Sequence, residues 1–357
     1  MAILNMKALF LAGGTGTRLW PLSRASKPKQ LHTLVGDKSL MTQTIERVSG
    51  IVDRKDVWII TAEGYLQQIA EQCPGVPKSQ FITEPFPLGT GLAIGLGLTH
   101  LSLKHPDAVV LLGWADSYVG NVEIFTAALK QAEQLVSLVE GVMLVVPPTY
   151  PAKCYGYIET GEPLGGDLGA SAIVRFEEKP SYERAKGLVE TGKHFWNSGF
   201  SVWRVSALLE LMREHMPDHF DALQEFAPTI GTDREQAQMR DSFSGLEPIS
   251  IDRAIFEKAT GLAAIPVVMG WSDIGSWGAL YDVRKTNDET LTRGAVVTVD
   301  TDNCLILSEG RLIATLGISD LVIIETDDAI LVVHKDQTER LKELYEKVKT
   351  FGGDKYL

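Results

Sequence analysis

The hydrophobic positions in the first part of the chain form short apolar runs that alternate with longer amphipathic stretches. Five runs have the length and composition of buried strands, at residues 8–11, 57–60, 80–83, 108–112 and 142–146. Four stretches have helical length or periodicity, at residues 39–48, 64–72, 91–103 and 125–138. This alternation predicts an α/β fold with a doubly wound, mainly parallel sheet and helices on both of its faces.

The pattern is mixed from residue 150 to about residue 285. Strand-like runs lie at residues 155–159, 173–176, 200–205 and 265–269. Helical stretches lie at residues 181–190, 206–215 and 251–258. Residues 228–246 are polar and poorly patterned, so we expect a loop or a loose helix there.

After about residue 290 the chain becomes rich in short β-type runs. They recur about every 8–10 residues, at residues 295–299, 304–307, 312–316, 321–325 and 330–334. A charged helix is predicted at residues 338–349. This rhythm is typical of a small all-β unit, either a stacked β-helix or a sandwich. We therefore predict two domains, a larger one at residues 1–285 and a β-rich one at residues 286–357.

Composition adds information mainly through charge. The 357 residues carry 34 Lys and Arg against 46 Asp and Glu, a net charge of −12. This balance argues against a general nucleic-acid or anionic-membrane surface, so a polyphosphate ligand would need a local cationic loop and a divalent metal. No apolar run approaches the roughly 20 residues of a membrane span, and the first residues lack the pattern of a signal peptide.

The three cysteines, Cys73, Cys154 and Cys304, are widely spaced. They follow neither a disulfide framework nor a zinc-binding spacing. We expect free thiols in a cytoplasmic protein that has no nucleic-acid or membrane partner.

A glycine-rich stretch directly follows the first predicted strand. Gly13, Gly14 and Gly16 let the backbone turn sharply, and the exposed N–H groups of such a loop form a nest for phosphate oxygens. Arg18 adds a guanidinium fork that grips phosphate with two hydrogen bonds, and Lys29 adds a second cation. The stretch is neither a Walker A motif nor a dinucleotide fingerprint. The alternative reading is a tight strand-to-helix turn without a ligand.

The string from Gly13 to Leu22, followed by Pro28-Lys29-Gln30, resembles the signature of sugar-1-phosphate nucleotidyltransferases. The motif Trp-Pro-Leu-Ser-Arg at residues 20–24 makes the chain most similar to the mannose-1-phosphate guanylyltransferase (GDP-mannose pyrophosphorylase) family. The resemblance runs from about residue 7 to the C-terminus. It implies Mg²⁺-assisted in-line transfer of a guanylyl group from GTP to mannose 1-phosphate, giving GDP-mannose and pyrophosphate. It also implies a short left-handed C-terminal β-helix, through which two copies could pair as a homodimer.

The same resemblance assigns roles around the loop. Arg18, Lys29 and Asp116 are expected to be catalytic. The nucleotide is expected to contact the end of the first strand and the loop, at Leu11, Gly13, Gly14, Thr15, Gly16 and Thr17.

Two aspartates follow predicted strands and match the metal-holding pair of the family. Asp116 comes after the run 108–112, and Asp273 comes after the run 265–269. Mg²⁺ is commonly held by one or two carboxylates, with substrate oxygens completing its shell. We predict that Asp116 and Asp273 hold Mg²⁺. The alternative for each is the cap of a following helix or turn.

Further family elements concern the sugar and the base. Residues expected at the sugar phosphate are Gly156, Glu178, Lys179, Asn197 and Asp252. Residues expected at the base are Glu84, Pro85, Gly89 and Thr90. Taken singly, Glu178 could be a solvated charge, Asn197 a turn residue and Asp252 a helix cap.

The chain differs from the sequence motifs of the family at several positions. Trp114 and Ser117 flank Asp116 where the family has Pro and His, Cys154 replaces a glycine, and residues 88–90 read Leu-Gly-Thr. Two alternatives therefore stay open. One is another NTP:hexose-1-phosphate nucleotidyltransferase, either a thymidylyltransferase or a heptose-phosphate guanylyltransferase. The other is a catalytically weakened homologue that binds sugar nucleotides as a regulatory subunit.

His215 and His219 have a helical spacing that could suggest a metal pair. No glutamate follows His215, and Pro217 interrupts the helix between the two histidines. We expect surface histidines at a helix end.

Overall fold

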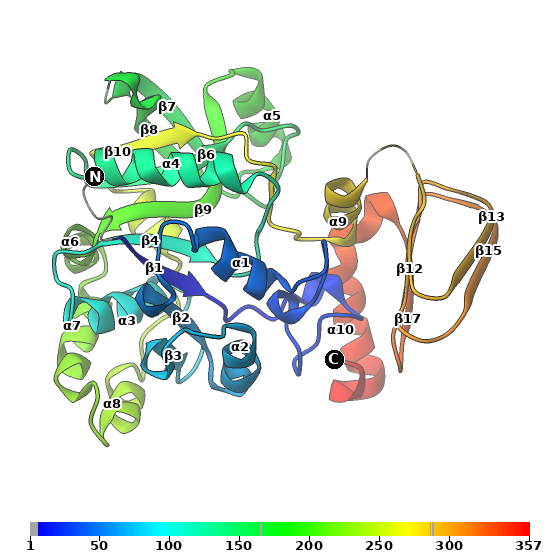
Figure 1. Cartoon of the computed structure of the whole chain (residues 1–357), viewed down its shortest axis with the longest axis horizontal. Coiled ribbons are helices and arrows are strands. Elements are labelled where there is room, and N and C mark those ends of the chain that lie inside the picture. The colour runs from blue at the N-terminus through cyan, green and yellow to red at the C-terminus, as the bar shows by residue number, and fades with distance from the viewer. Residues whose placement is uncertain (1–5, 165, 286, 288) are drawn as a thin grey trace. The chain divides into compact units, whose positions relative to one another are not determined.

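The computed structural model describes residues 6–164, 166–285, 287 and 289–357 (Figure 1). The chain forms two compact units. The large unit comprises Met1–Gly13, Ile45–Ala115 and Val119–Trp271, and the small unit comprises Gly14–Thr44, Asp116–Tyr118 and Ser272–Leu357. The chain therefore leaves the large unit inside the glycine-rich loop, directly before Asp116 and directly before Ser272. The domain boundary predicted at residue 285 stays a prediction, and residue 286, where the second domain was to begin, lies outside the described residues.

The large unit is built on a nine-stranded sheet of order β3-β2-β1-β4-β9-β6-β10-β8-β7. Its strands are β1 (Met6–Leu11), β2 (Val57–Ala62), β3 (Phe81–Glu84), β4 (Val109–Trp114), β6 (Gly141–Val146), β7 (Gly156–Leu164), β8 (Ala170–Glu178), β9 (His194–Arg204) and β10 (Leu262–Pro266). The predicted α/β fold class is confirmed by this architecture, and the sheet is mainly parallel, because among the described strands only β9 and β8 run against the others. Strands β3, β2, β1 and β4 are parallel, as are β6 and β10. Strand β9 runs antiparallel to β4 and β6, and β8 runs antiparallel to β10 and β7.

Helices pack around this sheet (Figure 1). They are α2 (Leu66–Gln72), α3 (Thr90–Ser102), α4 (Val122–Leu135), α5 (Tyr182–Glu190), α6 (Val205–His215), α7 (Pro217–Phe226) and α8 (Glu235–Ser242), with a single π-helical turn at Asp252–Phe256. Helix α3 is buried along most of its length, because its leucines and small residues pack into the main core. Among the described residues, no helix is long and apolar enough to cross a membrane.

Among the local predictions for this unit, the strand at residues 265–269 was right only in part and the surface position of His219 was wrong. The strand predicted at residues 265–269 begins earlier and ends at Pro266, because the pairing with β6 involves Leu262–Pro266. Helix α8 lies within the stretch predicted as a loop or loose helix. Pro217 begins helix α7 at its first turn, where its missing N–H is tolerated. His219 is not a surface residue, because it is only 9% exposed and its Nε2 lies 2.9 Å from the carbonyl oxygen of Glu247.

The small unit contains the β-rich part of the chain. One sheet has the order β12-β14-β16-β17, and β13 pairs with β15. These strands are β12 (Leu291–Arg293), β13 (Val296–Asp302), β14 (Leu305–Ser308), β15 (Ile313–Ser319), β16 (Leu321–Glu325) and β17 (Ile330–His334). The pairs β12–β14, β14–β16 and β13–β15 are parallel, so successive turns of the chain stack as in a β-helix. Its handedness stays a prediction.

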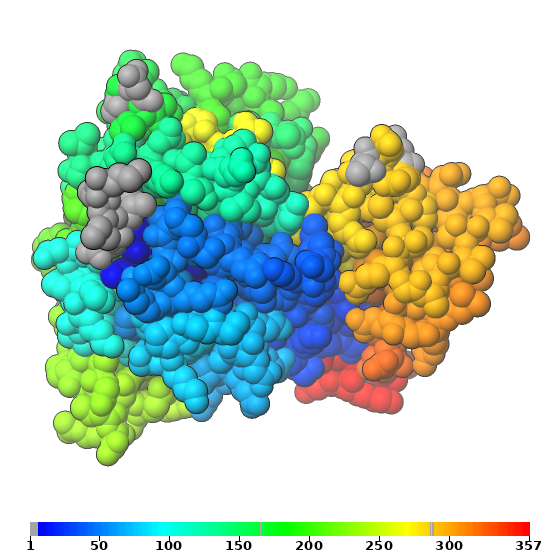
Figure 2. Space-filling view, in the orientation of Figure 1, coloured from blue at the N-terminus to red at the C-terminus, as the bar shows by residue number. Residues whose placement is uncertain are grey.

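The outer face of the β13–β15 pair is apolar and open to solvent. Val297, Val299 and Leu316 are each more than half exposed, and these strands lie at the surface in Figure 2. Their opposite face packs on Cys304, Ile306 and Ile323 as a separate small core. All three cysteines are free, as expected.

The core of the small unit joins the segment after the glycine-rich loop to the C-terminal part of the chain. Leu19, Trp20 and Leu22 pack with residues of helix α9 (Trp277–Arg284), the β-helix strands and helix α10 (Leu341–Gly352). The indole N–H of Trp20 donates to the carbonyl of Tyr356 at 2.6 Å. Arg24 forms an ion pair with Asp328 at 2.6 Å. Three short elements carry the chain between the units: helix α1 (Leu40–Val48), β5 (Tyr118–Val119) and β11 (Trp271–Ser272).

Candidate active site

The small unit brings the predicted catalytic and metal-binding residues together around Lys29. The Nζ of Lys29 lies 2.9 Å from Oδ2 of Asp116, and it also donates to the backbone carbonyl of Asp273. The Lys29 side chain is only 6% exposed, so its ammonium needs these partners. One buried cation therefore touches both aspartates of the predicted pair.

Arg18 is the second cation of this cluster. Its Nη2 lies 3.9 Å from Oδ2 of Asp273, and its Nη1 lies 3.7 Å from Oε2 of Glu339. The guanidinium stands at the end of a short 3₁₀ turn, Thr17–Leu19, whose Leu19 is buried in the core. The burial of Leu19 keeps Arg18 on the accessible side of the turn.

The conformation of the loop explains why a glycine occupies position 16. Gly16 has a φ of 68°, in the left-handed region that favours glycine. A Cβ on Gly16 would lie 2.5 Å from the Cβ of Lys29, so a larger residue would displace the lysine. The hydroxyl of Ser23 donates to the carbonyl of Thr15 at 2.6 Å and fastens the other side of the loop. Gly14, Thr15 and Thr17 belong to the same unit as Arg18 and Lys29.

The donor set fits a hard divalent cation that keeps part of its shell for substrate. Asp116 and Asp273 are 35% and 26% exposed, so their oxygens remain accessible. Oδ1 of Asp273 accepts from the backbone N–H of Gly275 at 2.9 Å, which orients the carboxylate. No group of three or more His, Cys, Asp or Glu in the described part of the chain could enclose a metal. Two carboxylates with open positions match the preference of Mg²⁺ rather than a closed structural site.

The residues predicted for the sugar phosphate lie together in the large unit. Gly156 of β7 is the register partner of Glu178 on β8, and a Cβ on it would lie 2.7 Å from a Glu178 carboxylate oxygen. Lys179 pairs with Glu178 at 2.6 Å. The side-chain amide of Asn197, on β9, donates to Oδ1 of Asp252 at 3.2 Å. The structure thus assembles these five residues from three strands and the π-helical turn.

The electrostatics of this group are unusual at Asp252. Burial and, second to it, the negative charge of nearby Glu178 together raise the pKa of Asp252 to about 7, against the opposing charge of Lys179. The Glu178 side chain is 8% exposed, whereas Lys179 is 57% exposed. These side chains therefore offer hydrogen-bond donors and acceptors that are mostly buried, with the exposed ammonium of Lys179 at their edge. A sugar phosphate needs both, because its hydroxyls require hydrogen-bond partners and its phosphate requires a cation.

Glu84, predicted at the base, ends strand β3 and lies half-buried beside Gly13. A Cβ on Gly13 would lie 3.3 Å from Oε2 of Glu84. Burial raises the pKa of Glu84 to about 7. A narrow cavity at this position is lined by Glu84, Pro85, Phe86, Leu92, Ala93, Leu96 and Phe243. Two of the four residues predicted for the base therefore border an apolar crevice that is too narrow to hold a water molecule.

The structure gives Gly89, Thr90 and Leu11 packing partners that were not predicted. Gly89 has a φ of 86°, and a Cβ on it would lie 2.3 Å from the carbonyl oxygen of Ile249. The Thr90 hydroxyl accepts from the backbone N–H of Ile251 at 3.0 Å, so this segment fastens the chain that carries Asp252. Leu11 ends β1, and its carbonyl accepts from Ala115 at 3.0 Å.

Sequence reasoning missed Glu339 and Glu257. Oε1 of Glu257 accepts from the backbone N–H of Glu178 at 3.0 Å, and Glu339 faces Arg18. Both lie in charged stretches without a motif, so no local signal could have singled them out.

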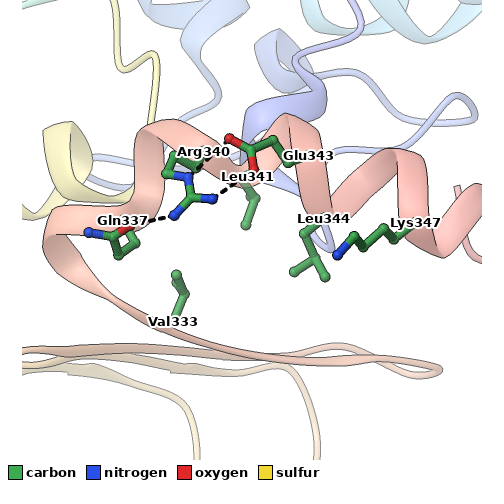
Figure 3. Close-up of a pocket in the computed structure, with 7 residues that line it drawn as sticks. All are labelled: Val333, Gln337, Arg340, Leu341, Glu343, Leu344 and Lys347. Carbon is green, nitrogen blue, oxygen red and sulfur yellow. Dashed lines mark hydrogen bonds and ion pairs between the residues drawn. The ribbon is translucent and has the colours of Figure 1, made fainter.

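The small unit also has an open groove of about 220 Å³ between β17 and α10 (Figure 3). It is lined by Val333, Gln337, Arg340, Leu341, Glu343, Leu344 and Lys347. Arg340 donates to Gln337 at 3.1 Å and to Glu343 at 2.8 Å, so its charge is engaged within the groove (Figure 3).

Comparisons with known proteins show the family of this chain. Residues 7–290 match the family model described as nucleotidyl transferase, and residues 294–348 match the MannoseP isomerase/GMP-like beta-helix domain. Mannose-1-phosphate guanylyltransferase 2 of Escherichia coli O157:H7 is 35% identical over 98% of this chain and 75% of its own length. Mannose-1-phosphate guanylyltransferase of Escherichia coli K12 is 31% identical over 99% of this chain and 75% of its own length.

Among solved structures, a protein of Thermus thermophilus described as a mannose-1-phosphate geranyltransferase is similar. It has a TM-score of 0.87 and 32% identity, over 97% of this chain and 99% of that one. The family match covers most of the chain, and the glycine-rich loop, the Lys29 cluster and the stacked strands from β13 to β17 lie within the matched ranges. The protein is therefore a member of the nucleotidyl transferase family, with a C-terminal beta-helix domain of the MannoseP isomerase/GMP-like type.

Proposed function

We propose that this protein transfers the guanylyl group of GTP to mannose 1-phosphate, giving GDP-mannose and pyrophosphate. The observation that carries the proposal is the cluster in which Lys29 touches both Asp116 and Asp273 while Arg18 stands beside Asp273. Two cations and two accessible carboxylates suit a reaction in which a metal and a polyphosphate are held together. The similarity to mannose-1-phosphate guanylyltransferases over nearly the whole chain supports this choice of nucleotide and sugar.

The chemistry is phosphoryl-type transfer without a covalent enzyme intermediate. An oxygen of the sugar phosphate attacks the α-phosphorus in line, and the bond to the β-phosphate breaks as pyrophosphate leaves. Arg18 and the loop N–H groups hold the β- and γ-phosphates, and Lys29 stabilises the charge that develops at the α-phosphoryl group. Asp116 and Asp273 would hold Mg²⁺, which neutralises phosphate charge when bound.

The large unit supplies recognition in this proposal. Glu84 accepts hydrogen bonds from the N1–H and the N2 amine of guanine, which adenine does not offer together. Asn197, Asp252 and Glu178 bind sugar hydroxyls, and Lys179 meets the sugar phosphate. The proposal includes a cytoplasmic location and homodimer formation through the β-rich part of the chain.

The test is a screen for pyrophosphate release with each common NTP against several sugar 1-phosphates. We expect GTP with mannose 1-phosphate to give the highest kcat/KM, by at least about tenfold over ATP, because unpaired buried groups discriminate at roughly 1–3 kcal/mol each. A clear preference for dTTP, UTP or glucose 1-phosphate would assign the chain to a sister activity. Binding of GDP-mannose without any pyrophosphate release would favour the regulatory alternative.

A further inference from the structure

Glu339 places a third carboxylate beside the cation cluster of the small unit. It belongs to the turn Lys335–Arg340, and its Oε2 lies 3.7 Å from Nη1 of Arg18. The other side of the same guanidinium lies 3.9 Å from Oδ2 of Asp273. Both separations are longer than hydrogen bonds, so the two carboxylates attract Arg18 without fixing it in one geometry.

The position of Glu339 is set by the packing around it. The hydroxyl of its neighbour Thr338, which is 2% exposed, accepts from the N–H of Gly278 at 3.2 Å and donates to the carbonyl of Lys335 at 2.8 Å. The buried indole of Trp277 donates to the carbonyl of Trp20 at 3.0 Å. The Thr338 bond joins the turn that carries Glu339 to helix α9, which follows Asp273. The Trp277 bond then joins helix α9 to the residues directly after Arg18. Glu339 is therefore held opposite Arg18 by the fold.

The metal does not account for this carboxylate. Asp116 and Asp273 already form a two-carboxylate set, and the described residues contain no metal-type group of three acidic or His/Cys side chains. Together with Lys29 and Arg18 the cluster has two cations and three anions. A polyphosphate that binds Arg18 must therefore compete with Glu339, which is 59% exposed and free to turn away.

We propose that Glu339 is a positioning residue that competes with the terminal phosphates for Arg18 and thereby promotes the release of pyrophosphate. This inference rests on the proposed function, because it takes Arg18 to be the ligand of the departing phosphates. When a triphosphate binds, Arg18 exchanges Glu339 for phosphate oxygens. When pyrophosphate leaves, Glu339 takes the guanidinium back. Product release limits the turnover of many enzymes, so a competing anion at this point favours completion of the cycle.

The test measures pyrophosphate binding to the full chain by calorimetry with Mg²⁺ present. We expect Glu339→Gln to bind pyrophosphate about two- to fivefold more tightly, the range typical of an exposed ion pair. The KM for the nucleotide should fall by a similar factor, with thermal unfolding unchanged. The gain in pyrophosphate affinity should become smaller as the salt concentration is raised, because salt screens the attraction between exposed charges.

Glu343→Gln is the matched control. Glu343 lies nearby in the C-terminal helix, is similarly exposed, and is engaged by Arg340 at 2.8 Å instead of Arg18 (Figure 3). Its removal deletes the same charge and should leave pyrophosphate affinity unchanged. If Glu343→Gln gained as much pyrophosphate affinity as Glu339→Gln, the gain would come from the change in net charge alone. That result would overturn the inference.

Arg18→Ala separates this inference from the proposed function. We expect this variant to lose most of its pyrophosphate affinity. If it does so while Glu339→Gln binds no more tightly than the wild type, the role of Glu339 is wrong and the proposed function stands. If Arg18→Ala binds pyrophosphate as well as the wild type, both the phosphate role of Arg18 and the role of Glu339 are overturned.

Discussion

The carboxylates proposed to be functional have different surroundings in the two units. In the large unit, burial raises the pKa values of Glu84 and Asp252 to about 7, and neither has a cation as its main partner. In the small unit, Asp116 and Asp273 are 35% and 26% exposed and stand beside Lys29 and Arg18. A buried carboxylate suits neutral donors such as hydroxyls and amines. An exposed carboxylate among cations suits a metal and phosphates.

Burial alone does not explain the difference, as Glu325 of the small unit demonstrates. Its side chain is 3% exposed, yet its pKa is lowered. Burial acts to raise that pKa, but the N–H groups of Gly310, Arg311 and Glu309 and the hydroxyl of Ser308 stabilise the ionised form and outweigh it. Asp252 instead faces the negative charge of Glu178. The supply of donors decides the direction of the shift.

The largest expected effect comes from the small unit. Asp116→Asn and Asp273→Asn should each lower turnover by at least about 10²-fold at saturating Mg²⁺, because a lost ligand charge weakens the metal at the reacting phosphate. Steady-state pyrophosphate release measures this. Asp336→Asn is the control, since Asp336 is 81% exposed and its ion-pair partner is His334. Activity within about threefold of wild type would remove the mutated residue from the metal site.

The next effect comes from the large unit. Glu84→Gln should lower kcat/KM for GTP by about tenfold and narrow the discrimination against ATP, because a carboxylate that accepts two guanine N–H groups is lost. For the wild type, the KM for GTP should rise as pH falls from 8 to 6, because Glu84, with its pKa of about 7, becomes protonated. The variant should lack this dependence. Parallel pH profiles for the two proteins would contradict the role given to Glu84.

The stability of the same variant gives an independent check. The pKa of Glu84 is raised in the folded chain, so its ionised form disfavours folding. The wild type should lose stability as pH rises from the ordinary carboxyl pKa of 4.5 toward 7, and this loss should be smaller in Glu84→Gln, in which Asp252 still contributes to it. Thermal unfolding in a series of buffers measures this difference.

The smallest effect concerns Glu325 and leaves the chemistry untouched. Its pKa is lowered from an ordinary value of 4.5, so its stabilising contribution is present above that value and is lost as pH falls through the folded pKa. Glu325→Gln should therefore lower the Tm at pH 7, with the difference from wild type shrinking toward pH 3. Glu309→Gln is the control, because Glu309 is exposed and lies in the turn whose N–H groups bind the Glu325 carboxylate. A difference in Tm that does not depend on pH would refute the donor-based explanation.

Local pattern determined most of the elements and the chemistry-bearing residues of this chain. Apolar runs predicted β1, β2, β4 and β6 nearly to their ends, because buried strands need continuous apolar sequence. The β-rich rhythm after residue 290 predicted a small all-β unit, and the family resemblance favoured a β-helix over a sandwich. The residues of the glycine-rich loop were found by their types and spacing, whereas the aspartate pair was found by its resemblance to the metal-holding pair of the family. The roles given to them stay predictions that the experiments above address.

Tertiary structure alone decided the features that depend on distant partners. The direction of β9 follows from its place between β4 and β6, which no property of residues 194–204 specifies. The grouping of Gly14–Thr44 with the C-terminal part of the chain depends on a core that pairs Leu19 and Trp20 with residues more than 250 positions away. The contact of Glu339 with Arg18 has the same origin. Burial and charge pairing are properties of the folded neighbourhood, so the raised pKa values of Glu84 and Asp252 could not be predicted from the sequence.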